Sequence, residues 1–493
     1  MAGGLAGQGR ESGVLTMLRE PARPAVIREH RLAPWFAVGT VCFGAFMGQL
    51  DASVVTLAFP ALQRQFSASL AEVQWVSLAY LLVLIGLLVP VGRLSDRYGR
   101  KLSYLLGFVV FAIASAACGF AVSLPMLIVL RVIQAAGAAL LQANSVALVA
   151  TSVPAPMRRA ALGVQAAAQA VGLALGPVAG GILVSSVGWR WIFFINVPVG
   201  LVAVTAGWYL LPRSRGLARN LSADPVGALL LAAATTGTLG ALSLLSEPGA
   251  RAWTVGVCAI LAALAVAGFI AWERRVTDPL VDLRMLASSG LGPALCGAMF
   301  AYLVLFGPLV LIPQVLSAQG DSVLRAGLML TALPAGFGLA AVAGERLLPQ
   351  AWSSNRARCL AGGLLAAACV AALAIPAPHS GTVVLLGLTG IGLGLYIPAN
   401  NADIMAAVPS GAAATAGGMV NMTRGFGTAL GVAVVTLGLH AGGRLGTRGG
   451  TGELLAIGVL AAGALAATWA GHLAGLRHHT ANGDRARHEL GEL

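Results

Sequence analysis

Long apolar segments alternate with short polar ones along almost the whole chain. A run of about 20 apolar residues is long enough for a helix to cross the hydrocarbon core of a bilayer. Fourteen segments meet this condition: 34–60, 71–92, 102–122, 124–150, 158–187, 191–212, 226–245, 252–272, 288–316, 324–344, 358–376, 382–408, 411–440 and 451–475. The pattern predicts an all-α polytopic membrane protein whose fourteen transmembrane helices are arranged as six, two and six.

The composition agrees with this pattern. Of the 493 residues, 58% are hydrophobic and only 10% are charged, whereas charged residues make up about 25% of an ordinary soluble domain. A net charge of +13 would suggest nucleic-acid binding in a soluble protein, but here the basic residues lie in short segments between apolar ones. We therefore expect the bilayer, and no nucleic acid, as the partner.

The positions of the basic residues also test the number of helices. If one helix too many were counted, every later loop would be assigned to the opposite side of the membrane. With both termini in the cytoplasm, the inner segments carry 23 of the 31 basic residues and the outer loops carry 6. Arg131 and Arg424 lie within spans. This asymmetry predicts fourteen spans, cytoplasmic termini and a location in the plasma membrane.

The same pattern divides the chain into two bundles, a helix pair and two tails. Two six-helix halves are typical of transporters whose repeats face a central site near the bilayer midplane. The six cysteines lie in apolar segments without CxxC spacing, so we expect neither a metal site nor a disulfide framework. The expected units are a cytoplasmic tail 1–33, a bundle 34–212, two additional helices with their flanks 213–287, a bundle 288–475 and a cytoplasmic tail 476–493.

Asp51, in GQLDASVVTLAFP, is the most informative single residue. It lies 16 residues after Trp35, which is about 24 Å along a helix, in a run with no other charge. An ionisable group at this depth is costly and is a functional candidate by default. We expect Asp51 to take up and release a proton; a neutral Asp51 that hydrogen-bonds between helices is the alternative.

Arg131 lies inside the fourth span, in LRVIQAAGAALLQANS, without a charged neighbour in sequence. A buried guanidinium needs a carboxylate, carbonyl groups or water, and Asp51 is the one acid at a comparable depth. We therefore expect Arg131 to act with Asp51 in proton coupling, with a purely structural arginine as the alternative.

Other polar residues within apolar spans are candidates for a substrate cavity. They are Gln134, Gln142 and Asn144 in the fourth span, and Asn421 and Arg424 in the thirteenth. Arg424 could face the cavity or the membrane surface, and the sequence favours neither. Asp403 closes the preceding span, where we expect a solvated acid.

The loop after the second span reads GRLSDRYGRK from Gly92 to Lys101. It predicts a short cytoplasmic turn whose acid and arginines bond neighbouring helix ends and latch one conformation; charge that only sets the topology is the alternative. The equivalent segment from Gly344 lacks the Asp and the paired glycine, so we expect a latch mainly in the first half. The latch candidates are Gly92, Asp96, Arg97, Gly99 and Arg100.

A glycine-rich span follows, GVQAAAQAVGLALGPVAGG from 163 to 181. Glycines four residues apart share one helix face and leave a groove where another backbone can approach closely in a membrane. Proline within a helix removes a backbone donor and bends it. A tightly packed helix pair without a transport role is the alternative. The residues concerned are Gly163, Gly172, Gly176, Pro177, Gly180 and Gly181.

Together these motifs resemble those of the fourteen-spanner drug:proton antiporters of the major facilitator superfamily. The glycine spacing is similar to the antiporter motif of this family, and GRLSDRYGRK is similar to its loop motif GxLaDrxGrkxxl. The stretch around Arg131 is similar to the motif RxxQGxGaA, with Ala135 in place of a glycine. The stretch around Asp51 is similar to LDxTIVNVALP, although Ser53 and Thr56 depart from it. WRWIFFINVPVG from Trp189 is similar to a signature of this branch, and we interpret it as an aromatic anchor at the outer interface.

The resemblance implies a major facilitator fold and a proton-coupled antiporter that exports small amphipathic drugs or antibiotics by alternating access. The proton gradient would drive export, at about one proton per cycle for one deep acid, and no cofactor is expected. We find no GxSxG, HExxH or GxxxxGK[ST] motif, so we expect no enzyme or ATP-driven pump. A carrier of one metabolite, such as a sugar or siderophore, and a membrane receptor remain as alternatives. The sequence indicates neither the substrate, for which Asp51 only weakly suggests a cation, nor the oligomeric state.

Overall fold

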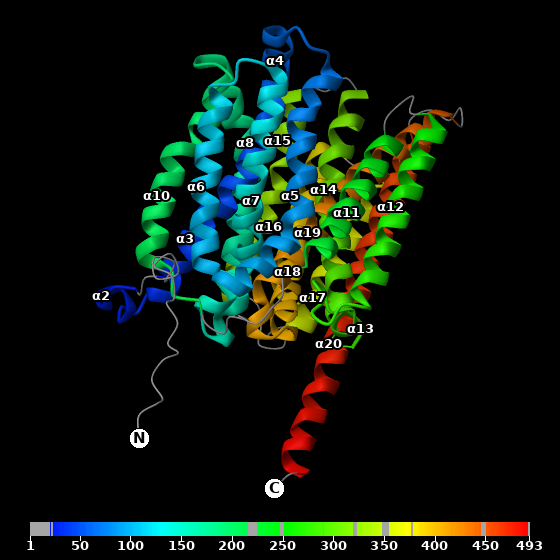
Figure 1. Cartoon of the computed structure of the whole chain (residues 1–493). Coiled ribbons are helices and arrows are strands. Elements are labelled where there is room, and N and C mark those ends of the chain that lie inside the picture. Colours follow the sequence, from blue (N-terminus) through cyan, green and yellow to red (C-terminus); the bar gives the residue numbers. More distant parts are fainter. Residues whose placement is uncertain are drawn as a thin grey trace, which may run out of the picture.

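A computed structural model of the chain describes residues 20, 23–214, 224–246, 251–288, 290–318, 323–347, 354–375, 378–444 and 450–491. These residues form an all-helical protein in which long helices run side by side (Figure 1). Most of the expected N-terminal tail and part of the flank after residue 214 lie outside the described residues.

The first group of helices covers residues 25–210. Two positions are set by local sequence: Ser69 and Glu72 form a reciprocal capping box at the start of α5, and Gly99 adopts a φ of +123° between α5 and α6. The elements are α2 (Ala25–Arg28), α3 (Ala33–Val54), η1 (Val55–Ala58), α4 (Phe59–Phe66), α5 (Leu70–Tyr98), α6 (Arg100–Gly119), α7 (Leu124–Ser152), η2 (Ala155–Met157), α8 (Arg158–Ser186), α9 (Trp191–Phe194) and α10 (Asn196–Leu210).

The second group begins with the additional pair and continues with six longer stretches of helix. α20 continues as one 42-residue helix through most of the expected C-terminal tail, and it extends beyond the other helices in Figure 1. The elements are α11 (Pro225–Ser246), α12 (Ala252–Glu273), α13 (Leu283–Ser288), α14 (Leu291–Ala318), α15 (Val323–Leu330), α16 (Ala332–Leu347), α17 (Asn355–Ala372), α18 (His379–Ala407), η4 (Ser410–Ala412), α19 (Ala413–Arg444) and α20 (Gly450–Gly491).

Each of the fourteen predicted segments contains helix in the structure. Within the described residues, twelve helices are long and apolar enough to cross a membrane. The two further segments, α8 and α17, are helical at the expected places but are not among these twelve. Some predicted spans consist of two pieces, since the first breaks into a 3-10 turn after Val54 and the sixth is divided between α9 and α10.

The two groups of six helices meet along several long helices. α8 packs against α16 and α18, and α19 packs against α5 and α7. α11 and α12 pack on one another, and α11 also contacts α5 and α19. In Figure 1 the pair lies on one flank of the molecule. The inner faces of α5, α7, α8 and α19 therefore form the interface on which any movement of the halves depends.

Candidate functional site

Asp51 lies in the last turns of α3, near the middle of the candidate span Ala33–Phe66, and its side chain is fully buried. Oδ2 of its carboxylate is 2.7 Å from Nη1 of Arg131. Oδ1 accepts hydrogen bonds from Nε2 of Gln134 and Nδ2 of Asn196, each at 3.1 Å. Both carboxylate oxygens are thus occupied by donors, as a buried ionised carboxylate requires.

Arg131 of α7 is held on several sides. Nη1 also donates to Oε1 of Gln134 at 2.7 Å, and Nε donates to the carbonyl oxygen of Val76 at 3.1 Å. The guanidinium carbon lies 3.9 Å from the centre of the Tyr80 ring and 5.8 Å from that of Phe193. Aromatic faces attract a desolvated cation, so the pair is stabilised by charge, hydrogen bonds and rings together.

Ser115 of α6 completes this network. Its Oγ accepts from Nε2 of Gln134 at 2.6 Å and from Nδ2 of Asn196 at 3.3 Å. We call Asp51, Arg131, Gln134, Ser115 and Asn196 the Asp51 site. Its five side chains come from α3, α6, α7 and α10, all within the first six long helices, so the site does not need the second half for its assembly.

Sequence reasoning missed Asn196 and Ser115. Asn196 belongs to the WRWIFFINVPVG stretch, which we interpreted only as an aromatic anchor, and that interpretation was incomplete. Trp191 is half exposed, whereas Trp189 is buried and donates from Nε1 to Oε1 of Gln65 at 2.7 Å. A neutral amide in an apolar run was the available signal, but neutral amides are too common in spans for that signal to be specific.

The glycines of α8 contact the helix that carries Asp51. A Cβ on Gly172 would lie 2.5 Å from the backbone oxygen of Phe46, and one on Gly176 would overlap the hydroxyl of Ser53. A Cβ on Gly180 would lie 2.7 Å from a side-chain carbon of the same helix. The groove that the spacing predicts therefore exists, and α3 fills it.

The outer glycines of this motif behave differently. A Cβ on Gly163 would overlap the carbonyl oxygen of Ala341 in α16, so this end of α8 contacts the second half. A Cβ on Gly181 would have no atom within 4 Å. The side chain of Pro177 lies outside the part of the chain that the structure describes.

Asp96 is also buried, at the opposite end of α5 from the capping box. Oδ1 accepts from Nε of Arg100 at 2.8 Å and from the backbone NH of Ala414 at 2.9 Å. Oδ2 accepts from the backbone NH and the hydroxyl of Thr415, both at 2.8 Å. Since the first NH groups of a helix lack intrahelical acceptors, this carboxylate satisfies the start of α19 from the other half of the protein.

The neighbouring loop residues divide into those that cross to the second half and those that do not. Arg100 donates to the carbonyl oxygen of Ser410, and a Cβ on Gly92 would lie 2.5 Å from the backbone oxygen of Ala414. Gly99 instead abuts Glu20, and Arg97 lies with its guanidinium carbon 5.2 Å from the centre of the adjacent tyrosine ring. We call Gly92, Asp96, Arg100 and the start of α19 the Asp96 site.

A smaller contact also joins the halves, between the start of α8 in the first half and the loop segment of the second half. Nη1 of Arg159 at the start of α8 donates to Oδ1 of Asn355 at 2.9 Å, and Nδ2 of Asn355 donates to Oδ1 of Asp403 at 2.5 Å. The second loop thus also contributes a contact between the halves. One expectation is corrected: Asp403 is a half-buried acceptor, not a solvated acid.

Arg424 of α19 lies between the two halves. It is 8% exposed and donates to the side-chain oxygens of Gln142 in α7 and Gln169 in α8. Asn421, one turn earlier, donates from Nδ2 to the backbone oxygen of Gln142 at 2.7 Å. The structure thus places Arg424 at the interface between the halves.

The five cavity candidates do not form one cluster. Gln142, Asn421 and Arg424 lie together, whereas Gln134 belongs to the Asp51 site. Nδ2 of Asn144 donates to Oγ of Ser95 at 2.8 Å, next to Asp96.

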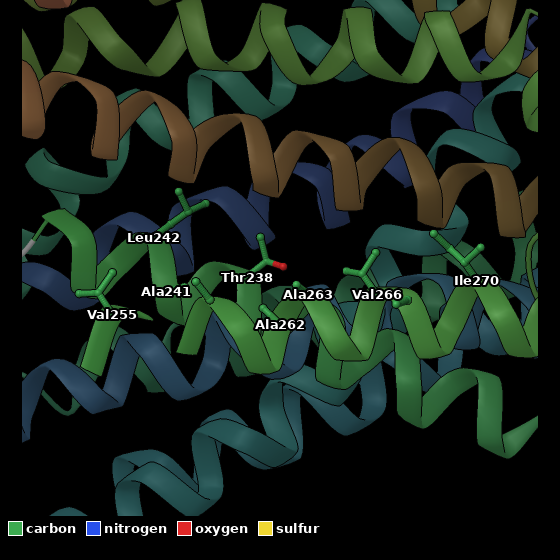
Figure 2. A pocket seen from close by; sticks show the side chains of 10 residues that line it. Thr238, Ala241, Leu242, Val255, Ala262, Ala263, Val266 and Ile270 are labelled. Atoms are coloured by element: carbon green, nitrogen blue, oxygen red, sulfur yellow. The ribbon is translucent and has the colours of Figure 1, made fainter. Parts of the chain in front are cut away.

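A groove with a volume of about 550 Å³ lies away from these residues, along α11 and α12. Figure 2 shows its small, mainly apolar lining, with Thr238 as a polar exception among alanines and valines. The additional pair is also joined to the end of α5, where Arg93 donates to the backbone oxygens of Asp278 and Pro279 at 2.9 and 2.5 Å. A groove with this mainly apolar lining does not by itself identify a substrate site.

Comparison with known proteins adds the family. The Major Facilitator Superfamily model matches residues 41–432. The Tetracenomycin C resistance and export protein of Streptomyces glaucescens is 33% identical over 424 residues, which cover 84% of this chain and 77% of that protein. The riboflavin transporter RibZ of Clostridioides difficile is 30% identical over 401 residues, covering 81% and 87%.

A solved structure supports the fold alone. The human organic anion transporter MFSD10 superposes with a TM-score of 0.66 at 15% identity, over 89% of this chain and 99% of that one. The chain therefore belongs to the major facilitator superfamily and is a multi-pass membrane transporter, not an enzyme.

Proposed function

We propose that this transporter exports a small amphipathic drug or antibiotic from the cytoplasm in exchange for protons. The observation that carries the proposal is the Asp51 site, a carboxylate–arginine pair buried near the middle of a span. A relative named for resistance and export of an antibiotic supports the direction and the substrate class.

Asp51 and Arg131 are proposed to carry the proton coupling. Protonation of Asp51 would remove the negative charge that Arg131 contacts at 2.7 Å, and the donors from Gln134 and Asn196 would lose strength because charge-assisted hydrogen bonds are the stronger ones. The rearranged site would shift α3 against the glycines of α8. Since Gly163 of α8 contacts α16, such a shift can reach the other half.

The Asp96 site is proposed as the conformational latch. The hydrogen bonds that Asp96 accepts from Ala414 and Thr415 exist only while the halves are together at this face. The excess of basic residues supports a cytoplasmic location of this face, so the present arrangement would be closed on that side. Opening it would break the latch and complete alternating access.

The topology proposed with this mechanism has fourteen spans, cytoplasmic termini and a location in the plasma membrane. α8 has 29 residues and α17 has 18, which correspond to about 44 and 27 Å of helix. Because the hydrocarbon core is about 30 Å thick, both are close to or above the length needed to span it. The charge pattern of the loops supports the same arrangement.

A carrier of a single metabolite is the second candidate, since one relative is named as a riboflavin transporter. It differs from the first candidate in substrate range and, where it imports its substrate, also in direction. Cells with and without the protein, exposed to a panel of toxic compounds, distinguish the two. Resistance to several compounds that disappears with a protonophore supports the exporter; sensitivity or uptake of one compound supports the carrier.

The direct test uses purified protein in vesicles with an imposed pH gradient and a trapped pH-sensitive dye. A compound from the resistance panel should accelerate proton movement through the native protein and leave the Asp51→Asn variant at the level of empty vesicles. Proton movement by that variant equal to that of the native protein would refute proton coupling through Asp51.

A further inference from the structure

Within the described spans, the buried positive charges outnumber the buried negative ones. The interface between the halves would therefore attract a negatively charged group. Arg131 is compensated by Asp51, whose two carboxylate oxygens are already occupied by three donors. The other buried acids in the described residues, Asp96 and Glu273, lie at helix ends. Among the described residues, Arg424 is therefore a buried cation within a span whose charge this pairing does not compensate.

The side chains around Arg424 are neutral. Its guanidinium donates to the amide oxygens of Gln142 and Gln169, and its carbon lies 5.8 Å from the centre of the Tyr302 ring. Amide oxygens satisfy the donors without compensating the charge, and a buried uncompensated charge is costly. An incoming anionic oxygen would form a stronger, charge-assisted hydrogen bond with the same donors.

Tyr80 provides a second, independent observation. It is 1% exposed, and within the described residues its hydroxyl has no hydrogen-bond partner. Its ring packs on Arg131, and its helix α5 packs against α19, the helix that carries Arg424. A buried hydroxyl without a partner loses its hydration without compensation, so this donor is available to a ligand.

We propose that Arg424 and Tyr80 form a subsite for an anionic oxygen, such as a carboxylate or phenolate, on an otherwise apolar substrate. This inference rests on the proposed export function and narrows its substrate class. It reverses the weak expectation of a cationic substrate that Asp51 alone suggests, because the charge of Asp51 is already compensated by Arg131 and its oxygens also accept from Gln134 and Asn196.

The position of the subsite connects it to movement of the halves. Arg424 belongs to α19, whereas Gln142 and Gln169 belong to α7 and α8. An anionic group that takes the donors of Arg424 would replace contacts that now join the halves. Substrate binding would thereby weaken the central interface while the Asp96 site still holds one end.

Two xanthene dyes of similar shape test the charge preference: fluorescein, which is anionic at neutral pH, and rhodamine 123, which is cationic. Binding to the full-length purified protein is measured by fluorescence anisotropy. We expect a Kd for fluorescein at least about tenfold lower than that for rhodamine 123, which corresponds to about 1.4 kcal/mol. Equal binding of the two dyes, or tighter binding of rhodamine 123, would overturn the inference.

Variants then assign the preference to the subsite. Arg424→Gln should raise the Kd for fluorescein about tenfold with less than a twofold change for rhodamine 123, and Arg424→Lys should retain part of the preference. Tyr80→Phe, which removes only the hydroxyl, should raise the Kd for fluorescein severalfold. Arg251→Gln, at an exposed residue before α12, is the matched loss of one positive charge and should change neither Kd.

Transport separates this inference from the proposed function. Gradient-driven export without a preference for fluorescein, or with a preference that Arg424→Gln and Tyr80→Phe leave unchanged, would refute the subsite and keep the exporter. Selective binding of fluorescein without gradient-driven movement of either dye would keep the subsite and refute the antiporter. Elution of each variant as a single peak on size-exclusion chromatography excludes misfolding as the cause.

Discussion

Two buried carboxylate–arginine pairs lie in the same half of this protein, and they differ in what surrounds them. Asp51 and Arg131 are 2.7 Å apart, on helices distant in sequence. Asp96 and Arg100 are 2.8 Å apart and separated by four residues, on either side of a tight turn. The partners of Asp51 come from the first half alone, whereas Asp96 also accepts from the first NH groups of α19 in the second.

This difference indicates separate roles for the two pairs, ion binding for one and control of the movement of the halves for the other. The charge of Asp51 can change without breaking a direct contact between the halves, which suits a site that binds an ion. The hydrogen bonds of Asp96 depend on the halves being together, which suits a latch. One chemical pair can therefore serve two purposes, because the purpose depends on which helices supply the remaining donors.

The largest expected effect comes from Asp51→Asn. The amide cannot exchange a proton, so gradient-driven transport in vesicles should fall to background. It also leaves Arg131 without a counter-charge, and breaking a buried pair from one side costs about 3–5 kcal/mol, so the thermal unfolding temperature should fall as well.

The double variant Asp51→Asn, Arg131→Gln is the control for stability. It removes both charges and should recover much of the unfolding temperature while transport stays at background. Recovery of transport together with stability would mean that the pair is structural, and the contrast between the two sites would lose its functional meaning.

The next effect concerns Asp96→Asn, compared with Arg97→Gln in the same loop. The neutral amide introduced by Asp96→Asn would offer weaker acceptors to Ala414 and Thr415 and would leave Arg100 uncompensated. We expect conformers with separated halves at this face to increase about tenfold, measured by pulsed EPR distances between labels on exposed residues of α6 and α17.

Arg97→Gln should leave the same distance distribution unchanged, because Arg97 contacts the adjacent tyrosine ring and not α19. Equal shifts of the distance distribution in the two variants would show that only the total charge of the loop affects the separation of the halves. The Asp96 site could then no longer be distinguished as a latch.

A smaller effect is expected from the contact between α8 and α3. Gly172→Ala places a methyl group 2.5 Å from the backbone oxygen of Phe46, and overpacking of this kind costs about 1–3 kcal/mol. The unfolding temperature should fall and proton coupling should weaken. Gly181→Ala, with no atom within 4 Å, should be neutral or slightly stabilising, and a similar loss in both variants would exclude close packing as the reason.

The smallest effect is expected from Asn196→Ala, which removes one of the donors to Asp51 and one of those to Ser115. Because Asp51 and Ser115 each keep a donor from Gln134, the loss should cost about 0.5–1.5 kcal/mol of stability and lower the transport rate without abolishing it. Thr205→Ala is the control, because Thr205 is an exposed residue of the same helix whose hydroxyl donates to the carbonyl oxygens of Leu201 and Val202 in that helix. An Asn196→Ala protein with native transport and stability would remove Asn196 from the Asp51 site.

Much of the fold could be predicted from the sequence. The fourteen apolar segments all contain helix, because in a bilayer the backbone must satisfy its own hydrogen bonds and the helix does so locally. The pairing of Asp51 with Arg131 could also be inferred, since two opposite charges at similar depth have few other partners. Likewise, the spacing of Gly172, Gly176 and Gly180 defines one face of α8 before its partner is known.

The tertiary structure alone decided what those faces and charges contact. Nothing in the order of residues indicated that Asn196 donates to Asp51, that the start of α19 meets Asp96, or that Arg424 lies between Gln142 and Gln169. The physical reason is that hydropathy and buried charge act on a segment through the solvent around it, whereas neutral amides, hydroxyls and helix ends act over about 3 Å. Their partners come from helices far apart in sequence, and only packing brings them within that distance.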